Sequence, residues 1–148
     1  NDALLEQDKK LGGKRKGLSG EKGVSEMQGL THDLLQIAFA NPENRIVLEY
    51  LGMYILFEKN IPLFKMFIEN FYEAPGLKPM PTHFQEAIVF AYESQPERWK
   101  EFGITDGMKK RFEEYKRLDI DSRLSPSLVN KLRSGFGNTY WYYYTYHK

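Results

Sequence analysis

The sequence contains no cysteine among its 148 residues. That absence excludes a disulfide framework, a thiolate nucleophile and a zinc site built on cysteine. Histidine is scarce as well, since only His32, His83 and His147 are present. A metal site made mainly of imidazoles is therefore not expected. We expect no metal and no other cofactor.

An excess of charge is also missing, because 21 Lys and Arg residues balance 20 Asp and Glu residues. This balance does not favour nucleic acid or an anionic membrane as a partner of the whole chain. The most apolar stretch, residues 46–57, is shorter than the ~20 residues needed to cross a bilayer. No signal-peptide pattern is present. The chain begins with Asn1 rather than Met, so we expect a fragment or a processed product.

The first 23 residues are rich in glycine and cations. Between Lys9 and Gly23 there are six cations, one acid and five glycines. Glycines at this density disfavour a helix, so we predict a flexible segment over residues 1–23 and one domain over residues 24–148. The alternative for this segment is a nucleic-acid or phosphate-binding patch. The phosphate-loop pattern G-x-x-x-x-G-K-[ST] is absent.

The most informative stretch runs from Asn41 to Asn60. Asn41 is a suitable N-cap and Pro42 a suitable first helical residue, which predicts a helix over residues 42–58. From residue 46 to residue 57 only Glu49 and Gly52 are neither apolar nor aromatic. A helix that apolar needs cover on more than one side. We expect it to be the central helix, ending where Asn60 adopts the left-handed conformation.

Other helices are predicted from apolar spacing and from capping residues. Ser25 and Thr82 each begin a capping-box pattern, and Thr105 or Asp106 can cap a later helix. The predicted helices span 25–40, 62–73, 82–94, 106–118 and a shorter stretch from Ser125-Pro126 to Gly135. The residues expected to face the core are Met27, Leu30, Thr31, Leu34, Leu35, Ala38, Leu63, Phe64, Phe67, Ile68, Phe71, Phe84, Ala87, Ile88, Ala91, Tyr92, Met108, Phe112, Tyr115, Leu128, Val129 and Leu132.

The last thirteen residues hold seven of the 22 aromatic side chains. Their β propensity is high, but no other segment offers a strand to pair with. We therefore predict a final helix capped at Asn138 or Thr139, with one face formed by Tyr140, Tyr143, Tyr144 and His147. Its rings would fill the last layer of the fold as a C-terminal cap. The alternative is an aromatic platform that stacks on sugars or bases.

The helix pair at 42–73 resembles a tetratricopeptide repeat, because Leu48, Leu51-Gly52 and Ile55 match the spacing of that repeat's signature. The segment 82–118 keeps only the hydrophobic spacing, and Phe64 replaces a small residue of the motif. The resemblance implies an all-α fold of antiparallel helical hairpins stacked as a degenerate tetratricopeptide-like array. In such an array the first helices line a concave face. The residues that would project toward it and bind a partner are Glu49, Tyr50, Met53, Gln85, Val89 and Tyr92.

The stretches NPENRIVLEYLGMYILFEKN, PTHFQEAIVF and FGNTYWYYYTY also resemble an uncharacterised bacterial family over residues 41–146. Members of that family combine a membrane-embedded N-terminal part with a helical-repeat C-terminal part. The resemblance implies that this chain is the soluble C-terminal portion of a protein of the bacterial cell envelope. It brings no catalytic residues with it.

One pair of residues merits testing for metal or acid–base chemistry, namely His83 and Glu86. Carboxylate di-metal sites use the reverse order, Glu-x-x-His, and need a second pair. A structural role is therefore favoured. No nucleophile elbow or dinucleotide-binding fingerprint is present, so we do not expect an enzyme. The sequence favours a non-enzymatic module that binds a protein, a peptide or the rest of its parent chain. The alternatives are a nucleic-acid or carbohydrate binder and an accessory domain of an envelope glycan enzyme.

Overall fold

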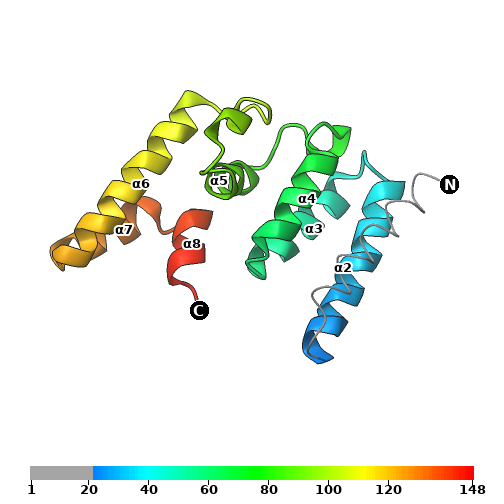
Figure 1. Ribbon diagram of the computed structural model, residues 1–148, viewed down its shortest axis with the longest axis horizontal. Coiled ribbons are helices and arrows are strands. Elements are labelled where there is room, and N and C mark those ends of the chain that lie inside the picture. The colour runs from blue at the N-terminus through cyan, green and yellow to red at the C-terminus, as the bar shows by residue number, and fades with distance from the viewer. Residues whose placement is uncertain (1–21) are drawn as a thin grey trace. The chain divides into compact units, whose positions relative to one another are not determined.

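A computed structural model describes residues 22–148 of the chain (Figure 1). The described part is all-helical, which confirms the all-α part of the predicted fold class. Most of the predicted basic segment, including Lys9, Lys10, Lys14, Arg15 and Lys16, lies outside the described residues. The described residues divide into two compact units, residues 22–60 with 73–78 and residues 61–72 with 79–148. No helix within residues 22–148 is long and apolar enough to span a membrane.

The first unit contains α2 (Lys22–Ala40), α3 (Arg45–Phe57) and a short 3-10 turn, η1 (Pro75–Leu77). Helix α3 packs against both α2 and η1. The side chains at the centre of this unit are apolar and almost fully buried, and they are Leu35, Ala38, Leu48, Leu51, Ile55 and Leu77. Helix α2 begins at Lys22, so Ser25 lies inside the helix and is not its cap.

The start of α3 differs from the sequence prediction. The N-cap is Asn44, whose Oδ1 accepts a hydrogen bond from the Val47 amide at 3.2 Å. Asn41 instead donates from its side-chain amide to the Ile37 carbonyl at 2.9 Å and so satisfies the last turn of α2. Asn41 and Asn44 flank Pro42 and Glu43, and the side chain of each forms a hydrogen bond with the backbone of the helix nearer to it.

The end of α3 also differs in one residue. Lys59, and not Asn60, adopts the left-handed conformation, with φ at +57°. The Lys59 amide donates to the Leu56 carbonyl and the Asn60 amide to the Ile55 carbonyl. This pair of bonds is the Schellman arrangement, which satisfies helix-end carbonyls and terminates the helix.

The loop that contains η1 is packed tightly within the first unit. The Gly76 amide donates to the Pro42 carbonyl at 3.0 Å, and Leu77 is fully buried. A Cβ atom on Gly76 would lie 2.8 Å from the Glu43 carbonyl carbon and 2.8 Å from the Pro42 oxygen. Glycine is required here because two backbone segments meet without room for a side chain.

The second unit contains α4 (Ile61–Phe71), α5 (Thr82–Ala91), the 3-10 turn η2 (Pro96–Trp99), α6 (Asp106–Leu124), α7 (Ser127–Phe136) and α8 (Tyr140–Tyr146). Helix α5 contacts α4, η2, α6 and α8, so it is the centre of this unit. Helices α6 and α7 lie side by side as an antiparallel pair (Figure 1).

The core of the second unit follows the predicted spacing closely. The predicted residues that are buried are Phe64, Phe67, Ile68, Phe71, Phe84, Ala87, Ile88, Ala91, Tyr92, Phe112, Tyr115 and Leu132. Leu63, Met108 and Leu128 are half-buried. Val129 was expected inside but is 40% exposed. The predicted end of α7 at Gly135 is also wrong, because the helix continues through Phe136.

Capping residues explain two helix starts and leave a third unexplained. Thr105 caps α6 by accepting from the Met108 amide at 3.2 Å, and Thr139 caps α8 by accepting from the Tyr142 amide at 3.2 Å. The predicted capping box at Thr82 does not form, because α5 begins after Pro81 without a side-chain cap. Helix α6 extends six residues beyond its predicted end at residue 118.

Candidate interaction surface

Helix α3 has one buried face and one exposed face. The buried face carries Leu48, Leu51 and Ile55, each no more than 1% exposed. The exposed face carries Ile46, Tyr50 and Phe57, which are 80%, 60% and 57% exposed. The cover that the sequence predicted for this helix is therefore incomplete within the described residues.

The exposed apolar side chains of α3 form a continuous line, which we call the α3 stripe: Ile46, Tyr50, Met53 and Phe57. The spacing is four, three and four residues. At about 100° per residue these positions fall within one narrow sector of the helix. Met53 is half-buried and joins the two halves of the line.

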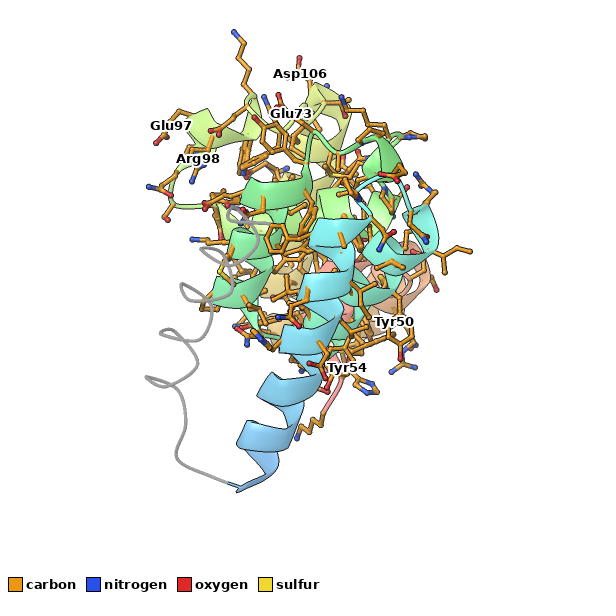
Figure 2. All side chains as sticks on the ribbon, turned by 90° about the vertical axis from the view of Figure 1, so that its right-hand side faces the viewer. Tyr50, Tyr54, Glu73, Glu97, Arg98 and Asp106 are labelled. Atoms are coloured by element: carbon orange, nitrogen blue, oxygen red, sulfur yellow. The ribbon has the colours of Figure 1, made fainter. Side chains whose placement is uncertain are left out.

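Carboxylates flank the α3 stripe. Glu43 precedes the helix, Glu58 follows its last residue, and both side chains are exposed. Glu49 lies beside the stripe and forms an ion pair with Arg45 at 2.8 Å. Burial, followed by the charge of Glu58 and the proximity of Tyr50, raises the pKa of Tyr54 above its usual value. Tyr50 and Tyr54 lie near one another at this surface (Figure 2).

The six residues predicted to bind a partner divide between the two units. Glu49, Tyr50 and Met53 lie in the first unit and are at least partly exposed, with Glu49 at 41% for its side chain. Gln85, in the second unit, is half-buried and donates to the Met80 carbonyl. Val89 and Tyr92 are fully buried, so they cannot contact a partner in this structure. Partner binding by the exposed residues stays a prediction.

Arg98 covers Tyr92 in the second unit. Its guanidinium lies 4.8 Å from the centre of the Tyr92 ring and forms a two-bond fork with Glu101. It also donates to Glu69 at 3.0 Å, and Glu69 accepts from the Tyr92 hydroxyl at 2.9 Å. Burial and the bond to Glu69 raise the Tyr92 pKa, while the bonds to Glu101 and Glu69 raise the pKa of Arg98.

Val89 is covered by the same segment of chain. The Trp99 indole donates from Nε1 to the Val89 carbonyl at 3.2 Å. Phe102 packs against Tyr92, with ring centres 5.0 Å apart. The connection after α5 therefore closes over the side of α5 that the repeat resemblance assigned to a partner. The length of this connection, residues 92–105 between α5 and α6, was the signal available in the sequence.

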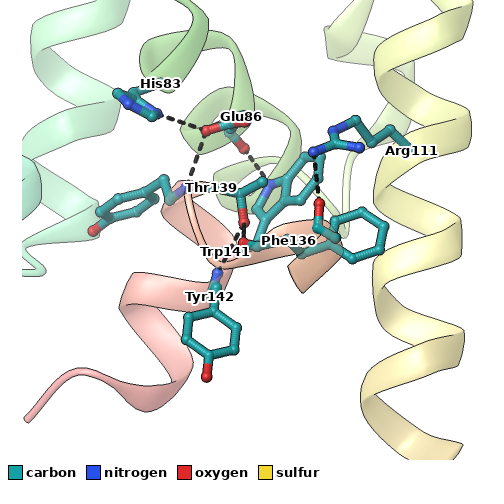
Figure 3. A network of polar contacts seen from close by, with 9 residues as sticks. His83, Glu86, Arg111, Phe136, Thr139, Trp141 and Tyr142 are labelled. Carbon is teal, nitrogen blue, oxygen red and sulfur yellow. Dashed lines mark hydrogen bonds and ion pairs between the residues drawn. The ribbon is translucent and has the colours of Figure 1, made fainter. Parts of the chain in front are cut away.

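Glu86 is the polar centre where α5 meets α8, and Figure 3 shows its contacts. Its side chain is 4% exposed. One carboxylate oxygen accepts from the Tyr140 amide at 3.0 Å and contacts His83 Nδ1 at 2.9 Å. The Glu86 backbone carbonyl accepts from the Trp141 indole at 2.8 Å. The predicted pair His83 and Glu86 does form, and its geometry anchors the C-terminal helix.

The aromatic tail is a helix, as predicted. Trp141 is 1% exposed and packs against Phe112, Tyr115 and Phe136, although the prediction placed it off the main face. On the predicted face, Tyr143 stacks against His147 at 4.6 Å and against Tyr140 at 5.8 Å. The rings of this helix thus contact one another and the rest of the second unit.

A metal site needs several ligating side chains that converge on one point. Within residues 22–148, no three or more His, Asp or Glu side chains converge on a point that could hold a metal ion. Most of the ionisable groups with shifted pKa values are tyrosines, such as Tyr92, Tyr115 and Tyr140, and burial raises the pKa of each.

The described residues form an all-helical protein with an exposed apolar stripe, and they hold no cluster of three or more His, Asp or Glu side chains suited to a metal ion. A family model described as a family of unknown function, DUF6057, matches residues 2–147. The chain belongs to this family. No curated protein and no solved structure gives a significant match.

Proposed function

We propose that the chain is a non-enzymatic interaction module that binds a protein partner through the α3 stripe. The observation that carries this proposal is the exposure of Ile46, Tyr50 and Phe57 in one line on a helix whose opposite face is fully buried. Leaving so much apolar surface in water forgoes about 25 cal/mol per Å² of burial. A contiguous apolar patch with polar edges is typical of a surface that binds another molecule.

The composition of the α3 stripe favours a protein partner. Tyrosine, phenylalanine and methionine are enriched at protein interfaces, where large rings add contact area at a low cost in side-chain entropy. Unbranched methionine adapts to the shape of its neighbour. The flanking polar residues Arg45, Glu49 and Glu58 supply the polar rim of such an interface.

We also propose that the helices form a degenerate tetratricopeptide-like array belonging to a larger bacterial envelope protein. The signature positions Leu48, Leu51, Gly52 and Ile55 are all buried within the first unit, as the repeat resemblance requires. The α3 stripe would then engage either another protein or a further part of the parent protein. Both are protein surfaces, and the stripe would bind them by the same contacts.

The proposal is tested by changing the stripe without changing the fold. The double variant Tyr50→Asp, Met53→Asp places two carboxylates on the α3 stripe. We expect it to lose the partner that the native chain retains in co-purification from cells that make the parent protein. Far-ultraviolet circular dichroism should be unchanged. A matched control, Ile120→Asp, alters another exposed apolar residue that is 59% exposed on α6. Equal capture by all three proteins would refute the proposal.

A further inference from the structure

Helices α7 and α8 meet at a corner formed by residues 137–139, which we call the α7–α8 corner. Gly137 has helical backbone angles, φ −61° and ψ −21°, and its amide donates to the Arg133 carbonyl at 2.8 Å. Thr139 is extended, with φ −94° and ψ 156°. The helical path of α7 therefore continues through Gly137, and only the last two residues of the corner separate it from α8.

Thr139 holds the α7–α8 corner through its backbone amide and its hydroxyl (Figure 3). Its amide donates to the Phe136 carbonyl at 3.0 Å, and its hydroxyl donates to the same carbonyl at 2.7 Å. The hydroxyl oxygen also accepts from the Tyr142 amide at 3.2 Å. Thr139 is only 3% exposed. One buried hydroxyl thus joins the last turn of α7 to the first turn of α8.

Glycine at position 137 fits the bent arrangement, in which space for a side chain is missing. A Cβ atom at Gly137 would lie 2.4 Å from the Arg133 carbonyl oxygen, whereas at Gly135 nothing lies within 4 Å of an added Cβ. Alanine has a higher helix propensity than glycine in a regular helix. A side chain at position 137 should therefore disfavour the corner and favour a straight helix.

The spacing of apolar and aromatic side chains continues through the corner without a break. Six of them are spaced three, four, four, three and four residues apart, and they are Val129, Leu132, Phe136, Tyr140, Tyr143 and His147. On a single helix, at about 100° per residue, they would lie within one sector of about 80°. Val129, the first of them, is 40% exposed in the bent structure. This spacing is typical of one amphipathic helix over residues 127–147.

We infer that the α7–α8 corner is a hinge, and that α8 can leave its own α5 and dock on the α5 of a second copy of the chain. In this open form α7 and α8 are one helix. The second copy is the partner because the structure shows how its site fits α8. There the Tyr140 amide meets the Glu86 carboxylate, and the Trp141 ring meets Phe112 and Tyr115.

The exchange preserves the contacts of α8, because each α8 meets in the second copy the side chains that it meets in its own. Only the bonds of residues 137–139 change, and such an exchange of identical elements is a low-cost route to a dimer. A short connection keeps α8 at a high effective concentration near its own α5. The closed monomer is therefore favoured in dilute solution, and the exchanged dimer forms as the concentration rises. The exchange does not depend on the α3 stripe.

One test biases the hinge and measures self-association. The variant Gly137→Ala, Thr139→Ala removes the hydroxyl that holds the corner and adds a side chain that the corner cannot accommodate. Sedimentation should show dimers that are at least about tenfold tighter than those of the native chain, since each dimer contains two hinges. The control Gly135→Ala raises helix propensity in α7 outside the corner and should associate like the native chain. A folded hinge variant that associates no more tightly than this control would overturn the inference.

A second test measures the opening of the hinge in an otherwise native chain. Because the chain has no cysteine, Ser127→Cys and Lys148→Cys can carry two spin labels, and dilution with unlabelled chain makes each measured distance intramolecular. A straight helix places the labels roughly 30 Å apart, and the bent form places them closer together. The longer distance should grow with protein concentration, and more strongly in the hinge variant. A single short distance at every concentration, or dimers that keep it, would overturn the inference even if the hinge variant does not fold.

Discussion

Trp141 is hydrogen-bonded to Glu86, although the two residues lie 55 positions apart in the chain. The Trp141 indole donates to the Glu86 backbone carbonyl at 2.8 Å, and the Glu86 carboxylate accepts from the amide of the adjacent Tyr140 at 3.0 Å. A carboxylate beside the first amide of a helix is stabilised by the positive end of the helix dipole. This junction holds the short helix α8, which is too short to be stable alone.

Trp141→Phe should destabilise the protein by about 1–2 kcal/mol, because it removes the hydrogen-bond donor and part of the ring volume. Trp141→Ala should cost about 3–5 kcal/mol, since it also removes the packing against Phe112 and Phe136. Urea denaturation followed by circular dichroism measures both. Equal stability of the native chain and Trp141→Ala would show that α8 is not docked as described.

Arg98→Ala should destabilise the second unit by about 1 kcal/mol, because the fork to Glu101 and the contact with the Tyr92 ring are both lost. Arg98→Lys should recover only part of this, since an ammonium cannot form the fork. The neighbouring exposed Lys100 provides the control Lys100→Ala, for which no change is expected. Thermal melts at two salt concentrations would check the effect, which should be smaller at high salt.

The stability of the protein should fall as the pH rises from about 10 to about 12. Burial raises the pKa of Tyr115 to about 12, against the opposing effect of its hydrogen bond with Thr145. The folded protein thus retains this proton at pH values where the unfolded chain, with a pKa of about 10, has lost it. The contribution of Tyr115 to stability is fully present below pH ~10, and by pH ~12 the free energy of unfolding has fallen by about 2–3 kcal/mol.

Burial shifts the pKa values of Tyr92 and Tyr140 in the same direction. Alkaline titration followed by circular dichroism and by tyrosinate absorbance should show unfolding together with a late group of ionising tyrosines. Ionisation of every tyrosine near pH 10 in a chain that stays folded would contradict the burial of Tyr115.

Gly76→Ala and Gly29→Ala should have opposite effects. At Gly76 a methyl group would meet the Glu43 carbonyl carbon at 2.8 Å, so the η1 loop must move at a cost of about 1–3 kcal/mol. At Gly29, within α2, nothing lies within 4 Å of the added Cβ, and the higher helix propensity of alanine should stabilise by about 0.5–1 kcal/mol. Chemical denaturation of the two variants in parallel is the measurement. Equal effects of the same sign would show that η1 is not packed against residues 42–43.

Apolar spacing was sufficient to predict the helices and most of their buried residues. Phe64, Phe67, Phe71, Phe84 and Ile88 recur at the helical period, and burial of these large side chains dominates the energy of packing. Helix ends were less predictable. Asn41 and Asn44 are both suitable N-caps. Asn44 takes this role because Pro42 and Glu43 lie in the turn between α2 and α3 and not in α3 itself.

The partner-facing residues show where spacing alone fails. Val89 and Tyr92 occupy exposed positions of the repeat pattern, yet the connection through η2 covers them with Trp99, Phe102 and Arg98. That connection has no period, so its path could not be inferred from the sequence. Tyr50 and Met53 lie on α3, where Tyr50 is 60% exposed and Met53 is half-buried, and they remain part of the α3 stripe.

Site-specific photocrosslinking from position 50 tests the central claim most directly. A photoreactive amino acid replaces Tyr50 in the protein as its own cells produce it, and a second variant carries this amino acid in place of Lys110, which is exposed on α6. We predict a discrete crosslink from position 50 to one protein segment, absent from position 110. Crosslinks from neither position, or the same crosslinks from both, would contradict binding through the α3 stripe.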